Sequence, residues 1–227
     1  MVKFAMAIGG AVAMLAGTPA LAQGAVASEA GSRVTAAITG GTLGVGPEVG
    51  FRASDTLGVR ANAMFFGVGT DFNSDGVEYD GKLNLESYGA MIDLYPFRGS
   101  FRVSAGARIN KNRGRVRARP TGPVEVGDET YTPTQIGELL GRAEVKNVAP
   151  ALTLGWGGSN RRGFLFGFDA GVLFQGKVRI RQFTSSGTLA NDPAFRASLE
   201  EERQEVQDDV DDYKVYPIVQ LSIGYRF

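Results

Sequence analysis

Hydrophobic and polar residues alternate along the last segment of the chain, residues 214–227. One set of alternate positions is entirely apolar, and it comprises Val215, Pro217, Val219, Leu221, Ile223, Tyr225 and Phe227. The positions between them are mostly polar or glycine. Because successive side chains of a β-strand point to opposite faces, this pattern predicts a strand with one face in an apolar medium.

The same alternation recurs upstream in segments that turn-forming residues separate. We predict further strands at residues 32–39, 42–52, 57–70, 80–95, 101–110, 147–156 and 164–182, which makes eight in all. The segment 101–110 alternates most regularly, 32–39 is weak, and 80–95 has apolar residues on both faces. The links are short at 53–56, 96–100 and 157–163, and they are longer at about 71–79, 111–145 and 185–213.

Short links that alternate with longer ones are typical of transmembrane β-barrels, in which short periplasmic turns face longer external loops. A soluble barrel would alternate equally well, with its apolar face inward. Two features favour the membrane barrel. The polar face is mostly small residues, as a narrow lumen requires. Aromatic residues also gather beside the short turns, as in a membrane-interface girdle, at Phe51, Phe101, Trp156, Phe164, Tyr225 and Phe227.

The start of the chain has the pattern of a secretory signal. Lys3 precedes an apolar run that ends near Leu15, and small residues at Ala20 and Ala22 give a cleavage pattern. The run of about a dozen residues is too short to cross ~30 Å of hydrocarbon as a helix. We therefore expect a signal peptide at 1–22, a periplasmic lead-in at 23–31 and a barrel at 32–227. The expected location is the outer membrane of a Gram-negative cell envelope, after export to the periplasm.

Composition excludes several classes of function. The 24 basic and 24 acidic residues give a net charge of zero, so bulk electrostatics give no case for nucleic-acid binding. The chain has no cysteine, which removes disulfides and thiolate metal sites. It also has no histidine, which removes the usual zinc hydrolases and Ser-His catalysis. We predict a protein that is not an enzyme, without catalytic or cofactor-binding residues.

Several charged residues fall on the lumen face of the predicted strands. They are Glu48, Arg52, Arg60, Arg102, Arg108, Asp169 and Arg226. An eight-stranded barrel has an interior just wide enough to be filled by side chains, so an unpaired charge there is costly. One interpretation is a structural network of ion pairs, and the other is a narrow polar conduit.

The segment that begins at Asp71 resembles the start of a calcium loop. Asp71, Asn73 and Asp75 supply oxygen atoms at the first, third and fifth positions, and Gly76 follows. The twelfth position is Lys82 rather than a bidentate glutamate. The alternative is a hairpin tip, because Asp-Gly is a favoured pair in tight turns. Calcium is therefore the one cofactor that the sequence suggests.

Basic residues accumulate from 98 to 119 with no acidic residue among them. If the strand phase continues past Ile109, then Lys111, Arg113 and Arg115 face outward above the lipid. We predict that these three residues contact the phosphates of lipopolysaccharide, which arginine binds in a bidentate manner. The alternative is a solvated loop.

The last long link contains a predicted acidic helix. Asp192 and Pro193 have the positions of an N-cap and the first helical residue. Apolar residues then recur at helical spacing, from Phe195 and Leu199 to Tyr213, with acidic residues between them. One hypothesis is a lid over the barrel, held by Lys177, Arg179 and Arg181. A helix beside an extended barrel wall and a partner-binding arm are the alternatives.

Residues 42–227 resemble the small eight-stranded outer-membrane barrels of Gram-negative bacteria, the group of the outer membrane protein A barrel, X and W. The segments 191–195 and 211–217 also resemble uncharacterised proteobacterial members. The resemblance implies an all-β fold, an eight-stranded antiparallel transmembrane β-barrel with the acidic amphipathic helix in its last external loop. It also implies that Tyr225 and Phe227 form the signal for the barrel assembly machinery.

These observations predict a monomeric outer-membrane protein with a structural or surface-interaction role. Its expected partners are outer-membrane lipids, lipopolysaccharide and the assembly machinery. The alternative function is a narrow porin-like channel or carrier for small, hydrophobic solutes, as the resemblance to outer membrane protein W suggests.

Overall fold

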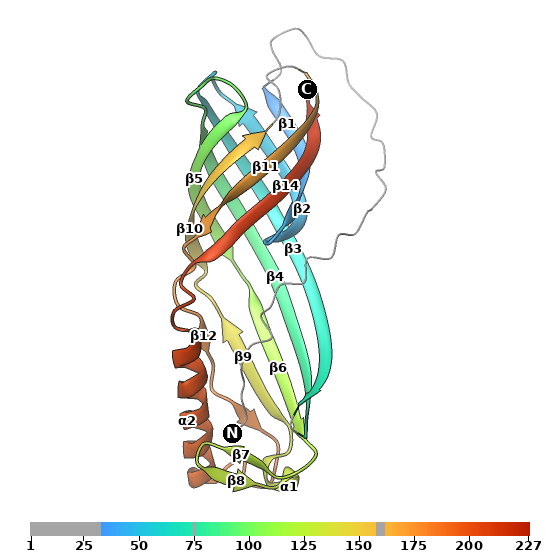
Figure 1. Ribbon diagram of the computed structural model, residues 1–227, viewed down its shortest axis with the longest axis vertical. Coiled ribbons are helices and arrows are strands. Elements are labelled where there is room, and N and C mark those ends of the chain that lie inside the picture. The colour runs from blue at the N-terminus through green and yellow to red at the C-terminus, as the bar shows by residue number, and fades with distance from the viewer. Residues whose placement is uncertain (1–32, 75, 158–161) are drawn as a thin grey trace.

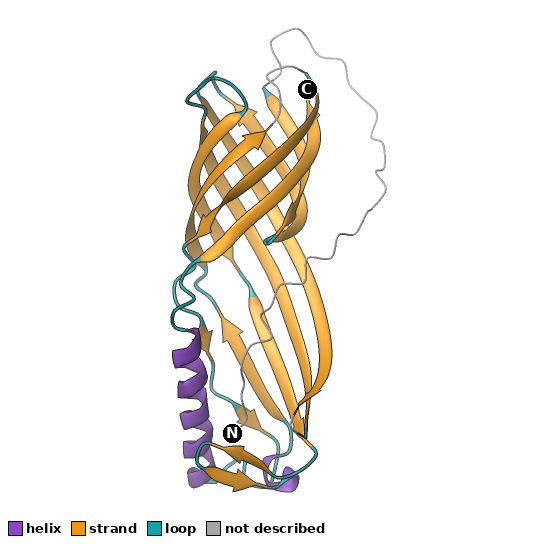
Figure 2. Cartoon of the chain, in the orientation of Figure 1, coloured by secondary structure: helices purple, strands orange, loops and turns teal. Residues whose placement is uncertain are grey.

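Eight antiparallel strands form a ring (Figures 1 and 2). The computed structural model describes residues 33–74, 76–157 and 162–227, so the predicted signal peptide and lead-in lie outside the described residues. In order around the ring the strands are β1 (Val34–Gly41), β2 (Gly44–Arg52), β3 (Leu57–Ser74), β4 (Val77–Leu94), β5 (Phe101–Asn110), β10 (Val148–Gly157), β11 (Gly163–Leu173) and β14 (Tyr216–Arg226). The predicted all-β fold with eight antiparallel strands is confirmed.

Pairing of the first strand with the last makes the ring continuous. Ala36 of β1 lies opposite Tyr225 of β14 on one side and opposite Val49 of β2 on the other. This segment alternates only weakly, but it pairs with a strand on each side. Such cross-strand pairs stabilise a sheet.

Side chains alternate between the lumen and the outer surface of the ring. On β14, Gln220 and Ser222 are buried in the lumen, whereas Val219, Leu221 and Ile223 are between 45% and 59% exposed. The strands also approach one another closely. A Cβ atom on Gly46 would overlap the carbonyl oxygen of Ala63. Close approach of this kind is one reason for glycine within a strand.

Strands β3 and β4 continue beyond the ring and begin an extension (Figure 1). Strand β4 pairs there with β6 (Arg113–Pro120), and β6 pairs with β9 (Leu139–Glu144). The short strands β12 (Arg179–Ile180) and β13 (Thr184–Ser185) then pair with β9. We call this end of the ring the extension end. The other, where the C-terminus lies, is the turn end.

The tip of the extension has a hydrophobic core of its own. The hairpin of β7 (Val124–Val126) and β8 (Glu129–Tyr131), together with α1 (Pro133–Ile136), covers the tip (Figure 1). The buried residues of this tip core are Val77, Tyr79, Ala118, Val124, Val126, Ile136, Leu139, Phe195 and Leu199. They come from strands, the hairpin and both helices, so the tip core joins segments that are far apart in the sequence.

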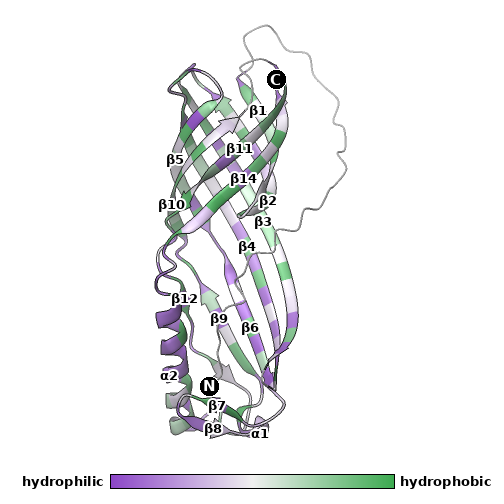
Figure 3. Cartoon of the chain, in the orientation of Figure 1, coloured by the Kyte–Doolittle hydropathy of each residue, from purple (hydrophilic) through white to green (hydrophobic). Residues whose placement is uncertain are grey.

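Helix α2 (Pro193–Val210) runs along the extension beside β12, and not across the ring (Figure 1). The Asp192 side chain caps it by accepting a hydrogen bond of 3.0 Å from the Phe195 backbone N–H. Most of the helix is hydrophilic (Figure 3). Its position matches the alternative of a helix beside an extended wall, so the lid hypothesis is wrong. Neither described helix is long and apolar enough to span a membrane.

The structure corrects two of the three predicted external loops, 71–79 and 111–145, whereas the third was predicted to contain a helix. Residues 71–79 are not a loop, because β3 reaches Ser74 and β4 begins at Val77. The segment 111–145 contains β6 to β9 and α1 rather than irregular backbone, and 185–213 is largely α2. Within the extension, apolar side chains of alternate residues face the tip core, which gives these segments a reason to form strands.

A buried carboxyl group in the extension makes the stability of the tip dependent on pH. Glu202 of α2 is buried, and burial raises the pKa of its carboxyl group, with a further contribution from Glu205. A raised pKa in the folded state means that this group stabilises the fold fully below its unfolded pKa, about 4.3. The contribution is lost as pH rises through the folded pKa.

Replacing Glu202 by glutamine should therefore make the tip more resistant to proteolysis at pH 7 than in the parent protein, because the amide carries no charge to desolvate. The two proteins should become equal at about pH 4, below the unfolded pKa. Limited proteolysis of the detergent-folded proteins at several pH values measures this. Glu201→Gln is the matched control. An advantage that persists at low pH would show that charge is not its cause.

Candidate functional site

The lumen of the ring contains a network of buried charges centred on Arg60. Its Nε lies 2.7 Å from Asp93 Oδ2, and its Nη1 lies 3.3 Å from Glu48 Oε2 and 3.2 Å from Asp169 Oδ2. Arg102 Nη2 approaches Asp169 Oδ2 to 2.6 Å. We call these five side chains the lumen network, and all of them are buried.

Arg108 brings a third positive charge close to the three carboxylates. It donates hydrogen bonds of 2.8 Å to Asn62 Oδ1 and 2.9 Å to Ser87 Oγ, and Asn62 in turn donates to Glu48 at 3.1 Å. Three arginines and three carboxylates therefore balance. Buried charges are tolerated only when they are paired and hydrogen-bonded, and this arrangement supplies such partners.

Towards the extension end, an apolar layer adjoins the lumen network. It consists of the buried residues Leu43, Met64, Met91, Ala149, Ala151, Leu173 and Ile218. Met64 has no exposed surface and Leu173 only 1%. The Tyr216 hydroxyl packs against this layer and donates a 2.6 Å hydrogen bond to the Thr42 carbonyl oxygen. Charged and apolar side chains thus occupy successive levels of the lumen.

At the turn end, Arg52 ties two short turns together. Its guanidinium donates to the carbonyl oxygens of Asp55 at 2.6 Å and of Gly99 at 3.2 Å. It also lies 3.9 Å from the centre of the Tyr95 ring. The turns 53–56 and 96–100 are therefore anchored to the wall of the ring.

All seven charged residues that the sequence places in the lumen are buried within the ring, namely Glu48, Arg52, Arg60, Arg102, Arg108, Asp169 and Arg226. Arg52 differs from Arg60 and Arg102 in that it donates to backbone oxygen atoms of the turns. Asp93 was missed, although it is 1% exposed and binds Arg60. The signal was present, since Ile92 and Leu94 on either side of Asp93 are apolar and face outward.

The calcium loop proposed from the sequence does not have its expected conformation. Asp71 and Asn73 lie in the regular part of β3, opposite Asp80 and Glu78, and Asp75 lies outside the described residues. The twelve-residue loop that calcium coordination needs is absent, because β4 begins at Val77. No group of three or more acidic residues suited to a metal occurs in the described part of the chain.

The three residues predicted to contact lipopolysaccharide lie on the outer surface. Lys111 follows β5, pairs with Glu86 at 3.3 Å and lies over the Tyr88 ring. Arg113 and Arg115 are on β6 and are exposed. The three basic residues of the lid hypothesis, Lys177, Arg179 and Arg181, are also exposed. A hydrogen bond with Asp211 raises the pKa of Lys177 and lowers that of Asp211.

The predicted assembly signal lies at the turn end among aromatic residues. The rings of Tyr225 and Phe227 are 5.3 Å apart, and the Tyr225 ring is 5.4 Å from that of Phe164. Trp156 packs against Phe101 at 5.0 Å on the neighbouring strands. The aromatic grouping inferred from the sequence thus exists in space. The role of Tyr225 and Phe227 in assembly stays a prediction.

Comparison with known proteins finds similarity in structure alone. No protein-family model matches the sequence, and no curated protein matches it. The crystal structure of Acinetobacter baumannii CarO2 is similar, with a TM-score of 0.57, 15% identity and coverage of 86% of this chain and 99% of that one. A. baumannii CarO has a TM-score of 0.54 and 15% identity, over 86% of this chain and 97% of that one. The chain therefore shares the fold of CarO and CarO2.

Proposed function

We propose that the ring spans the outer membrane of a Gram-negative bacterium and holds the extension outside the cell. The observation that carries this proposal is the apolar belt, the band of exposed hydrophobic side chains around the ring. Phe166 is 72% and Ile92 58% exposed, whereas the charged Asp93 beside Ile92 is 1% exposed. An outer surface more apolar than the interior suits a ring surrounded by lipid.

The orientation follows from the two ends of the ring. Barrels of this class have short turns on the periplasmic side and longer segments outside. The turn end carries the short links 53–56 and 96–100, and the extension end carries β6 to β9, β12, β13 and both helices. We therefore place the extension on the cell surface, where it serves a structural or surface-interaction role without enzymatic activity.

The filled lumen argues for a protein that does not conduct ions. The lumen network and the apolar layer occupy successive levels, and an apolar constriction opposes the passage of ions. Buried side-chain nitrogen atoms that have no hydrogen-bond partner among the described residues include Arg108 Nε, Gln220 Nε2 and Arg226 Nε. Buried water molecules satisfy such atoms without forming a continuous path.

The purified protein, reconstituted in planar bilayers, should therefore show no stepwise conductance above that of the lipid. Liposomes that contain it should not swell in isotonic sugar. Met64→Gly, which removes a fully buried side chain from the apolar layer, serves as the comparison, because opening that layer should increase leakage. Regular conductance steps in the parent protein would refute the proposal and support the polar conduit.

One observation favours the second candidate, a carrier of small hydrophobic solutes. Phe66, Val68 and Phe72 of β3 are between 40% and 45% exposed in the extension. They lie opposite Leu85, Leu83 and Tyr79 of β4, on the face that continues into the tip core. Uptake of an apolar fluorescent dye into the same liposomes separates the two functions, since a surface-interaction protein leaves the rate unchanged.

A further inference from the structure

A cleft lies where the extension meets the ring. It has a volume of about 390 Å³ and is lined by Lys146, Lys177, Val178, Arg179, Gln207 and Asp211. Lys146 belongs to the link between β9 and β10, and Lys177 to the link between β11 and β12, while Gln207 and Asp211 come from the C-terminal end of α2. We call it the junction cleft. Its volume is within the range of about 300–1,000 Å³ of small-ligand sites.

The wall of the junction cleft is fixed by one side chain of α2. Gln207 Nε2 donates 2.8 Å hydrogen bonds to the Val178 carbonyl oxygen and to Asp211 Oδ1. Its Oε1 accepts a 2.9 Å hydrogen bond from the Ile180 backbone N–H. Helix and link are thus held together, and Asp211 is directed onto Lys177. A cleft with a fixed wall needs little rearrangement to bind a ligand.

The junction cleft has more positive than negative charge. Lys177 is neutralised by Asp211, whereas Lys146 and Arg179 have no ion pair with any described residue. Glu144 lies opposite Arg179 across the β9–β12 pair, but its carboxylate pairs with Arg181 at 2.7 Å. The stem of Lys146 lies against Gly176, where an added Cβ would be 3.0 Å from Lys146 Cδ. Gly176 has a φ of 70°. The left-handed glycine therefore brings Lys146 next to Lys177, and the two unpaired cations favour an anionic ligand.

The junction cleft also lies immediately above the apolar belt. Val148, two residues after Lys146, is 60% exposed, and Phe174, three residues before Lys177, is 47% exposed. Lys146 and Lys177 are thus separated from lipid-facing side chains by one and two residues of chain, respectively. If the ring spans the membrane as proposed, this is the level of the lipid headgroups.

Positive charge continues from the junction cleft onto the outer face of the extension. Arg115 of β6 lies directly opposite Lys82 of β4 on one side and opposite Arg142 of β9 on the other. Like charges that face each other across strands are destabilising. Neither Arg115 nor Arg142 has an ion pair with a described residue, although Asp80 is near Lys82. An external polyanion would neutralise this row.

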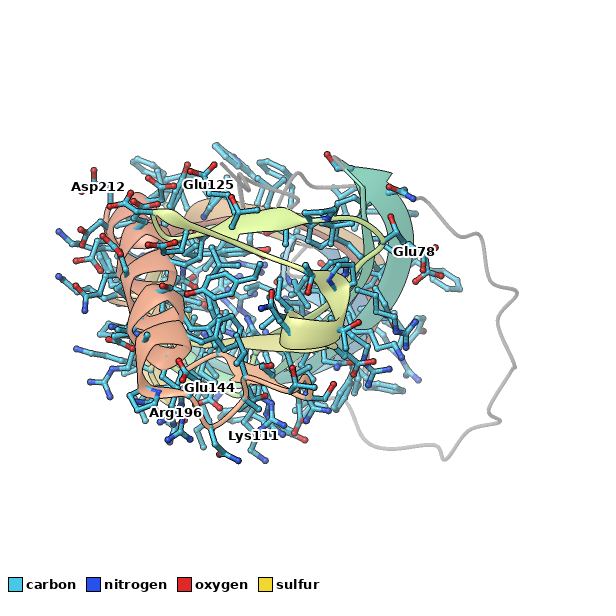
Figure 4. The ribbon with its side chains drawn as sticks, turned by 90° about the horizontal axis from the view of Figure 1, so that it is seen from below. Glu78, Lys111, Glu125, Glu144, Arg196 and Asp212 are labelled. Carbon is cyan, nitrogen blue, oxygen red and sulfur yellow. The ribbon has the colours of Figure 1, made fainter. Side chains whose placement is uncertain are left out.

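We propose that the junction cleft binds a phosphate of lipopolysaccharide through Lys146 and Arg179, and that the row of Lys82, Arg115 and Arg142 contacts further phosphates above it. The inference rests on the proposed membrane location. It moves the centre of the predicted lipopolysaccharide contact away from Lys111, whose charge is taken up by Glu86. Figure 4 shows Lys111 on one side of the molecule and Asp212, which follows Asp211 of the junction cleft, on the other.

The test compares the double variant Lys146→Gln/Arg179→Gln with the parent protein in detergent micelles, with rough lipopolysaccharide as the titrated probe. Binding should weaken about a hundredfold, because two charge-assisted hydrogen bonds are lost and each contributes roughly tenfold. Arg196→Gln, an exposed charge on α2 near the tip, is the matched control and should bind as the parent does. Dephosphorylated lipopolysaccharide should bind the parent as weakly as it binds the double variant.

Two outcomes would overturn the inference. The first is unchanged affinity in the double variant. The second is displacement of lipopolysaccharide by an equal concentration of inorganic phosphate, which would indicate a site for the free anion. Flotation with lipid vesicles after a carbonate wash reports insertion separately. A parent protein that fails to insert into lipid contradicts the proposed function, whereas an inserted protein without lipopolysaccharide affinity contradicts this inference alone.

Discussion

Replacement of Arg60 by leucine should destabilise the folded ring by about 3–5 kcal/mol, the usual effect of removing one partner from a buried ion pair. Arg60 contacts all three carboxylates of the lumen network, those of Glu48, Asp93 and Asp169. Without it, Arg102 still neutralises Asp169, but Glu48 and Asp93 keep no ion pair among the described residues. Two buried negative charges then oppose folding.

Urea unfolding in lipid vesicles, followed by the fluorescence of Trp156, measures this free energy, since Trp156 is the only tryptophan and belongs to β10. Arg196→Leu is the control, as it makes the same change at an exposed position. Acidification to about pH 3 should narrow the difference, because protonation removes the uncompensated charges. A decrease in the free energy of unfolding of less than about 1 kcal/mol is typical of exposed ion pairs. Such a result would contradict a filled lumen with tightly paired charges.

The ring could be predicted because one physical constraint acts on every strand. An apolar belt outside and a narrow lumen inside impose the same alternation on each strand, so even the weak segment at 32–39 was identified. The lumen residues followed from strand phase. Their partners did not, because the register between strands brings together residues as distant as Arg60 and Asp169. Asp93 was missed because leucine and methionine on both faces of its strand obscured the phase.

The extension was missed because no lipid imposes a pattern on it. Its outer face meets solvent, so β6 reads as a basic stretch, although Val116 and Ala118 alternate with its arginines. Residues 71–79 read as a polar loop, because Phe72, Val77 and Tyr79 are spaced among acidic and small residues. The apolar residues Val77 and Tyr79 are buried only in the folded protein, where they pack with residues of β6, β9 and α2. The position of α2 could not be predicted for the same reason. Its apolar residues pack against the tip core, which forms only when distant segments come together.

The tip core and the lumen network therefore stabilise two parts of the chain by different means. The tip core is apolar and remote from the lumen network, and the two share no residue. Mutations that are distant and share no partners usually have independent effects. The tip should consequently unfold locally without loss of the ring, and a single large side chain at its centre can test this.

Replacement of Phe195 by alanine should destabilise the tip by about 3–5 kcal/mol while the ring stays folded. Phe195 has no exposed surface and packs against Tyr131, with ring centres 4.8 Å apart. The same contact region includes the hydrogen bond of 3.0 Å between the Tyr131 hydroxyl and Ser198. Loss of the Phe195 side chain should expose α2 and the β7–β8 hairpin to protease. Cleavage is expected within residues 121–137 and 193–210.

Limited proteolysis of the folded protein, with the fragments identified by mass spectrometry, measures the opening of the tip, and Trp156 fluorescence in urea measures the ring. Phe97→Ala is the matched control, because Phe97 is 77% exposed at the turn end and its removal leaves no cavity. The variant Phe195→Ala should be cleaved far faster than this control and unfold at the same urea concentration. A common shift in both measurements would mean that ring and extension unfold as one cooperative unit, and the extension would then contribute directly to the stability of the ring.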